Sequence, residues 1–65
     1  MKLNVREIRR QMLRQGLTQK ALADKAGLSR QSINAILSRS TCSLVSMSKL
    51  ADGLGVDVET IWKED

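Results

Sequence analysis

Histidine, proline, tyrosine and phenylalanine are absent from this 65-residue chain, which has a single cysteine, Cys42, and a single tryptophan, Trp62. Without histidine and with only one thiol, the sequence lacks the ligands of a typical zinc site, a complete catalytic triad and a disulfide framework. It also offers no candidate pair of nucleophile and base. The sequence therefore predicts a protein that is not an enzyme and that uses no cofactor, metal or small-molecule ligand.

Secretory and membrane signals are lacking as well. We find no signal peptide and no apolar run long enough to span a bilayer. The lone Cys42 indicates a reducing compartment, and we interpret it as a small filler or loop residue rather than a reactive thiol. These features predict a cytoplasmic protein without a membrane partner.

The residues that are present favour helices. Apolar residues make up 42% of the chain, aromatic residues 2%, and there are only four glycines. This composition predicts an all-α fold whose core is built from Leu, Ala, Met and Ile. Because a chain of this length has room for one small core only, we expect a single domain over residues 1–65.

Charge is distributed unevenly along the chain. Residues 1–39 hold nine Lys or Arg against two acidic residues, a net charge of +7, whereas residues 40–65 have a net charge of −3. Solubility alone explains a charged surface but not this separation. The basic part predicts a polyanionic partner.

Apolar spacing and capping residues predict five helices, over residues 4–15, 18–26, 29–37, 43–55 and 57–62. No strand pattern is evident. Each helix begins at a residue whose side chain can cap it, and glycine follows three of them. The expected caps are Asn4, Thr18, Ser29, Ser43 and Asp57, and the expected stops are Gly16, Gly27 and Gly55.

Two positions in this scheme concern the core and one concerns helix stability. We expect Leu13 to share the buried face of the first helix with Met12. Trp62 is expected to close the core against that helix, with a dimer contact as the alternative. Gly53, inside the fourth helix, costs about 1 kcal/mol relative to alanine.

The segment 18–37 has the features of two short helices that cross at a tight turn. A small residue is needed at the crossing, and Ala23 satisfies this requirement. Gly27 tolerates the left-handed backbone that ends the first of the two helices. Ile33 then points an apolar side chain back at the crossing.

The joint pattern of Gln19, Leu22, Ala23, Gly27, Leu28, Ile33 and Ile36 is more specific than any one of these residues. With the segments GLTQKALA, GLSRQSINAI and KLADGLGVDVETIW, it resembles the Xre/Cro family of helix-turn-helix proteins, the lambda-repressor-like DNA-binding domains. The resemblance extends from about Ile8 to Trp62. It implies a compact five-helix domain whose central helix-turn-helix motif covers about residues 18–37.

The resemblance also implies which residues meet DNA. In this family the second helix of the motif enters the major groove and the first crosses the phosphate backbone. The matching base-reading positions are Arg30, Gln31 and Asn34, flanked by Ser29 and Ala35. Their chemistry fits independently, because Arg suits guanine, Gln or Asn suits adenine, and Ala can contact a thymine methyl. The phosphate-contacting candidates are Thr18, Gln19, Ser38, Arg39 and Thr41.

The chain departs from the family at two positions. Family members often pair an Arg in the first helix with a Glu late in the recognition helix, and the matching residues here are Met12 and Leu37. We expect an apolar contact to replace the buried ion pair, an exchange that is often neutral or stabilising.

These features predict a transcriptional regulator that binds double-stranded DNA, a repressor of phage or mobile-element type. Because one recognition helix reads only a few base pairs, a homodimer on a palindromic operator is expected. From the family, its dimer surface would include Leu44, Val45 and the C-terminal segment. The alternative is a protein-interaction module on the same fold, such as an antitoxin or an adaptor.

Overall fold

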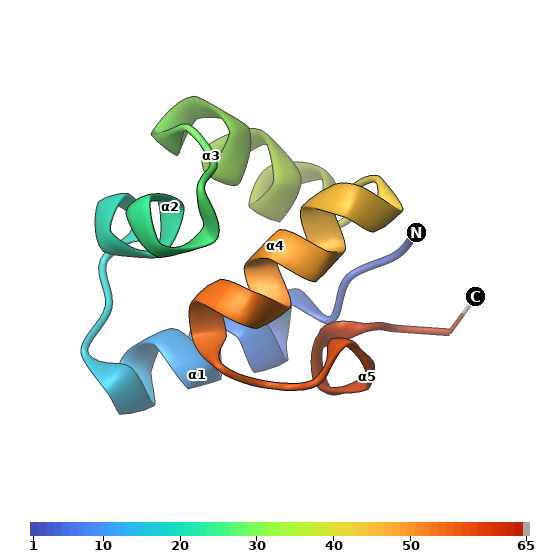
Figure 1. Cartoon of the computed structure of the whole chain (residues 1–65). Helices are drawn as coiled ribbons and strands as arrows, with labels where there is room; N and C mark the ends of the chain where they lie inside the picture. Colours follow the sequence, from blue (N-terminus) through green and yellow to red (C-terminus); the bar gives the residue numbers. More distant parts are fainter. Residues whose placement is uncertain (65) are drawn as a thin grey trace.

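The computed structural model describes residues 1–64 and consists of five helices (Figure 1). Asp65, counted above in the acidic part of the chain, lies outside the described residues. The helices are α1 (Val5–Gln15), α2 (Gln19–Ala26), α3 (Arg30–Arg39), α4 (Leu44–Leu54) and α5 (Val58–Ile61). The all-α fold class and the order of the helices are confirmed, and α3 continues two residues beyond Leu37.

Four of the five expected caps form hydrogen bonds. The side-chain oxygens of Asn4, Thr18, Ser29 and Ser43 each accept the backbone N–H of the residue three positions later, at 3.0–3.2 Å. Asp57 precedes α5 without a side-chain cap bond. The three expected glycine stops adopt left-handed backbone conformations, while α3 ends at a left-handed serine, Ser40, with φ of 59°. The helix boundaries therefore follow from local side-chain and backbone chemistry.

The core is apolar throughout residues 1–64, with no buried polar or charged side chain. α2 packs on α4 and on α3, and α5 packs on α4 and α1. A Cβ atom on Gly53 would stand only 3.0 Å from the backbone nitrogen of Ala26. Glycine inside α4 is thus explained by the close approach of α4 to α2, which offsets its intrinsic helix cost.

Leu13 was expected on the buried face of α1, and that expectation is wrong. Its side chain is 84% exposed, whereas Ile8 and Met12 are buried. The buried stripe of α1 follows residues 5, 8 and 12. Leu13 lies about 100° further around the helix than Met12, and no other element covers that side.

Trp62 does not close the core against α1. It is 42% exposed, and the buried neighbours at this place are Ile61 and Leu3. Residue 62 follows the last turn of α5 in an extended conformation and pairs with Leu3 in an antiparallel bridge. Because the helix has ended, Trp62 does not continue the buried face of Ile61, and much of its ring stays exposed.

An element without a sequence signal joins three distant segments, which we call the terminal ladder: residues 1–4, 40–42 and 61–63. Leu3 N–H donates to Ser40 O at 2.9 Å and Cys42 N–H donates to Met1 O at 3.0 Å. On the other side, Asn4 N–H donates to Ile61 O at 2.8 Å and Lys63 N–H donates to Lys2 O at 3.1 Å. Residues 1–4 thus bond like the central strand of a minimal antiparallel sheet.

Met12 and Leu37 both belong to the buried core cluster. Neither position carries a polar group, so no charge is desolvated there. A direct contact between the two side chains stays a prediction.

Candidate nucleic-acid interface

The junction of α2 and α3 fixes the direction of α3. Gly27, at φ of 70°, ends α2 with a backbone bond to Asp24 O, and Leu28 N–H donates to Ala23 O at 2.9 Å. Ser29 then starts α3. Ala23 on α2 and Ile33 on α3 are both buried, and the two helices pack against each other. The small residue, the turn and the branched residue therefore all serve the scaffold.

The outer face of α3 carries the expected base-reading residues. Ile33, Ile36 and Leu37 are buried, which leaves Arg30, Gln31, Asn34 and Ala35 exposed on the outer side of the helix. Within residues 1–64, the side chains of Arg30, Gln31 and Asn34 make no hydrogen bond or ion pair. Their donors and acceptors are available to a ligand.

Ser29 differs from the other base-reading candidates because its hydroxyl is engaged. It accepts Ser32 N–H at 3.0 Å and donates to Ser32 Oγ at 2.9 Å. The side chain is exposed and stands at the start of α3. Its structural task is to cap the helix, and the hydroxyl retains acceptor capacity for one further contact.

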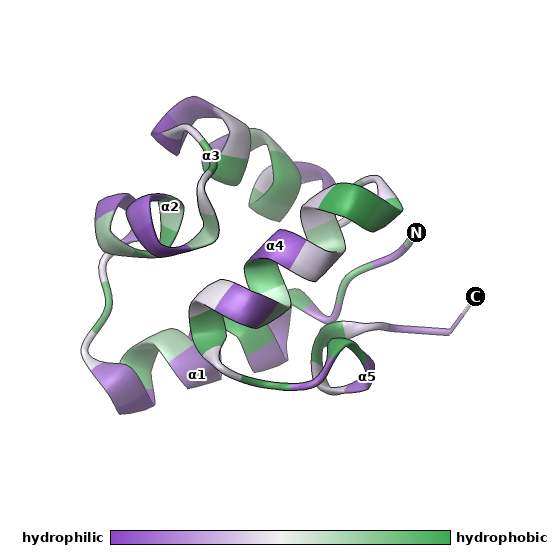
Figure 2. Ribbon diagram, in the orientation of Figure 1, coloured by the Kyte–Doolittle hydropathy of each residue, from purple (hydrophilic) through white to green (hydrophobic). Residues whose placement is uncertain are grey.

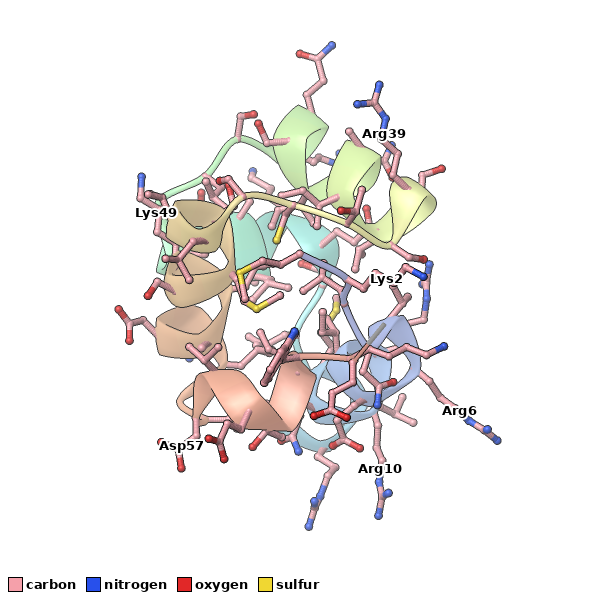
Figure 3. The ribbon with its side chains drawn as sticks, turned by 90° about the vertical axis from the view of Figure 1, so that its right-hand side faces the viewer. Lys2, Arg6, Arg10, Arg39, Lys49 and Asp57 are labelled. Atoms are coloured by element: carbon pink, nitrogen blue, oxygen red, sulfur yellow. The ribbon has the colours of Figure 1, made fainter. Side chains whose placement is uncertain are left out.

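The phosphate-contacting candidates come from two places, the start of α2 and the end of α3. Gln19 is the first residue of α2, and the Thr18 hydroxyl accepts Ala21 N–H at 3.1 Å. Ser38 and Arg39 are exposed in the last turn of α3, and Figure 3 shows Arg39 pointing outward from it. Thr41 is exposed, but its hydroxyl donates to Met1 O at 3.0 Å and is engaged within the protein.

A groove of about 270 Å³ lies between α3 and the first turn of α4. Its lining is rich in hydroxyl groups, and of its three serines only Ser43 was singled out from the sequence, as a helix cap. It is lined by Ser32, Ala35, Ile36, Arg39, Thr41, Cys42, Ser43 and Ser46. Spacing along the chain gave no signal for it, since the groove forms only when α3, the following loop and α4 are brought together.

The surface charge is strongest on α1. Arg6, Arg9, Arg10 and Arg14 are exposed, and the one acidic residue of this helix, Glu7, lies 3.8 Å from the Arg10 guanidinium. In Figure 3, Arg6 and Arg10 project outward from α1, while Asp57 lies on the left-hand edge together with Lys49. The uneven charge of the sequence is thus concentrated mainly on the exposed arginines of α1.

Cys42 lies half-buried at the groove. Burial raises the pKa of its thiol above the ordinary value, and the positive amino terminus opposes that shift. The neutral thiol is therefore favoured, consistent with the interpretation of Cys42 as a filler.

Comparison with known protein families decides the identity of the fold. Residues 6–61 match the family described as helix-turn-helix, which is most of the chain. The chain belongs to this family. The helix-turn-helix family in question is of the Xre and lambda-repressor-like type, a family of DNA-binding transcriptional regulators. Neither the curated proteins nor the solved structures contain a match to the chain.

Two further findings concern residues 1–64 of this helix-turn-helix protein. No group of three or more His, Cys, Asp or Glu side chains could hold a metal ion. None of the helices has the length and apolar character required to cross a bilayer.

Proposed function

We propose that this helix-turn-helix protein is a cytoplasmic repressor, of the phage or mobile-element type, that binds a palindromic operator in double-stranded DNA as a homodimer. The supporting observation is the exposed face of α3, where Arg30, Gln31 and Asn34 have no partner within residues 1–64. A guanidinium and two amides on one helix face suit the major-groove edges of guanine and adenine. Ser29 and Ala35 flank them.

Affinity for DNA would come from phosphate contacts on both sides of the base-reading residues. Gln19 starts α2, where backbone N–H groups favour an anion, and Thr18 precedes it. Ser38, Arg39 and Thr41 would contact a second phosphate region near the end of α3. The basic residues of α1 add long-range attraction.

The homodimer is supported by the location of the exposed apolar residues. Leu44 and Val45, 62% and 64% exposed, occupy the first turn of α4. Met1, 44% exposed, lies close to the start of α4 because its carbonyl accepts the Cys42 N–H, while Trp62 is exposed on the other side of the terminal ladder. Figure 2 shows the first turn of α4 as a hydrophobic end close to the N-terminus. Burying this patch against a second copy would remove apolar surface from water.

Selection of bound duplexes from a random pool tests base reading directly. We expect the wild-type protein to enrich a two-fold symmetric sequence with half-sites about 10 base pairs apart. Arg30→Ala and Asn34→Ala should each relax preference at their own positions and cost about 1–3 kcal/mol of discrimination. Uniform weakening at all positions, with unchanged preferences, would show that these residues do not read bases.

An antitoxin or adaptor is the second candidate, because the same apolar patch could receive a different protein. Salt dependence separates the two functions, since neutralised phosphates make log affinity for DNA fall linearly with log salt. If the protein binds no duplex in 50 mM salt, the DNA-binding proposal fails and the interaction module takes its place.

A further inference from the structure

The loop that follows α3 is held by the chain's first residues rather than by its own sequence. Ser40 adopts the left-handed conformation, which is uncommon for serine, and so turns the chain sharply out of α3. The carbonyl of Ser40 and the N–H of Cys42 then bond to Leu3 and Met1. The loop is thereby fixed on both sides of Thr41.

This pairing determines where the Thr41 amide points. In an antiparallel ladder, the groups that bond to the partner strand alternate with groups that face away from it. Because Ser40 O and Cys42 N–H face residues 1–3, the N–H of Thr41 faces the opposite side. Within residues 1–64 that N–H has no hydrogen-bond partner.

The Thr41 amide does not stand alone. Thr41 and Arg39 both line the groove beside α3, and Arg39 is exposed. The backbone N–H of one of these residues and the guanidinium of the other form a donor set that suits a phosphate oxygen. The Thr41 hydroxyl, in contrast, is directed to Met1 O and strengthens the ladder.

We propose that residues 1–4, and Leu3 above all, form a positioning element that aims the Thr41 amide and Arg39 at a DNA phosphate. Leu3 contributes twice, because its N–H bonds to Ser40 O and its side chain, only 2% exposed, anchors the strand in the core. The element acts through the loop and touches no DNA. This inference rests on the DNA-binding function proposed above, and it assigns the phosphate contact of Thr41 to the backbone amide, because the hydroxyl is engaged by Met1 O.

The test compares Leu3→Ala with Leu54→Ala in the full chain. Both leucines are almost fully buried, at 2% and 3% exposure, but Leu54 ends α4 and makes no bond to the ladder. Circular dichroism and thermal unfolding establish that each variant is folded at the temperature used. Leu3→Val and Leu54→Val form a milder matched pair should the alanine variants unfold.

The readouts are the salt dependence of binding to the duplex selected from the random pool, and ethylation interference at each phosphate. For Leu3→Ala we expect the slope of log affinity against log salt to fall in magnitude by about 0.9, the value of one phosphate contact. Interference should fade at one phosphate per half-site, base preferences should persist, and exchange of the Cys42 amide should accelerate. Leu54→Ala should keep the wild-type slope and interference.

Two outcomes would overturn the inference, and they differ from failure of the proposed function. If Leu3→Ala and Leu3→Val keep the full slope and every interference site, residues 1–4 do not position the loop. If Leu54→Ala loses the same phosphate, the effect is general destabilisation. Absence of any wild-type binding to duplexes at low salt would instead contradict DNA binding itself.

Discussion

The first turns of α3 and α4 have the same capping structure, but their exposed side chains are polar in α3 and apolar in α4. In each helix a serine caps the N-terminus and a second serine stands three residues later, with the same two hydrogen bonds between them: Ser29 with Ser32 and Ser43 with Ser46. The exposed pair after the first cap is Arg30 and Gln31, and the exposed pair after the second is Leu44 and Val45. Figure 2 shows the contrast as a hydrophilic and a hydrophobic helix end.

This difference shows that the residues that cap a helix are distinct from the residues that determine its binding partner. The cap hydrogen bonds satisfy backbone N–H groups and do not depend on the identity of the next two side chains. Those two side chains lie outside the core, so they are available to meet a ligand. A cationic and amide-bearing pair suits DNA, whereas an aliphatic pair suits a second protein surface.

The largest expected effect comes from making the α4 pair polar. In Leu44→Asp/Val45→Ser, the fold should survive because both side chains are exposed and an acidic residue is favourable in the first turn of a helix. Without the apolar contact the dimer should dissociate, and affinity for a two-half-site operator should fall by about 10²- to 10⁴-fold as the second half-site stops contributing. Sedimentation and gel-shift titration on duplexes with one and two half-sites measure both effects.

Arg30→Ala is the matched control, since it changes the equivalent turn of α3. It should remain dimeric while base preference relaxes at the positions that Arg30 reads. If the α4 double variant stays dimeric, or binds the two-half-site duplex as tightly as wild type, the apolar pair is not the dimer surface.

The inner side of α3 gives the next largest effect. Leu37 is buried in an apolar core, so Leu37→Glu places a charge there without a partner and should destabilise the fold by about 3–5 kcal/mol. Thermal unfolding followed by circular dichroism measures the loss. Leu37→Met, which nearly conserves volume, should cost less than about 1.5 kcal/mol.

Adding Met12→Arg to Leu37→Glu tests whether the two positions touch. If they do, the double variant should recover part of the lost stability, because an Arg and a Glu at these positions would form an ion pair. Wild-type stability of Leu37→Glu, or strict additivity of the two substitutions, would contradict a direct Met12–Leu37 contact.

The helices were predictable because their signals are local. Capping residues and left-handed glycines act within four residues of each helix end, and the buried Ile33, Ile36 and Leu37 dictate which side of α3 is exposed. The polar residues of the α3 face could thus be identified from spacing and from the family resemblance. Their contact with DNA remains a proposal.

Other features had no such signal because they depend on distant segments. The ladder pairs backbone groups of residues 1–4 with residues 40–42 and 61–63, and backbone pairing of single residues leaves no periodic pattern. Leu3 and Trp62 were therefore missed or misplaced. The role of Gly53 became clear only from the approach of α4 to Ala26, and the groove beside α3 only from three elements meeting.

The smallest expected effects come from the caps, and they test the comparison most directly. Ser29→Ala and Ser43→Ala each remove one cap bond of the same kind, so each should cost about 1 kcal/mol. For a domain of this size that cost corresponds to a melting-temperature decrease of about 4–8 °C. The two variants should be nearly equal in thermal unfolding but different in function: fraying of α3 should weaken DNA binding, and fraying of α4 should weaken the dimer.

Substituting glycine for Ser29 and Ser43 distinguishes a role in helix capping from a role in binding DNA or the second subunit. Ser29→Gly and Ser43→Gly should cost only a few tenths of a kcal/mol, because glycine is tolerated as an N-cap. If Ser29 only caps α3, Ser29→Gly should bind the selected duplex almost as well as wild type and with the same preferences. A changed base preference in Ser29→Gly, with stability intact, would instead show that the Ser29 hydroxyl contacts a base, and the two serine caps would then differ in function as well as in the residues that follow them.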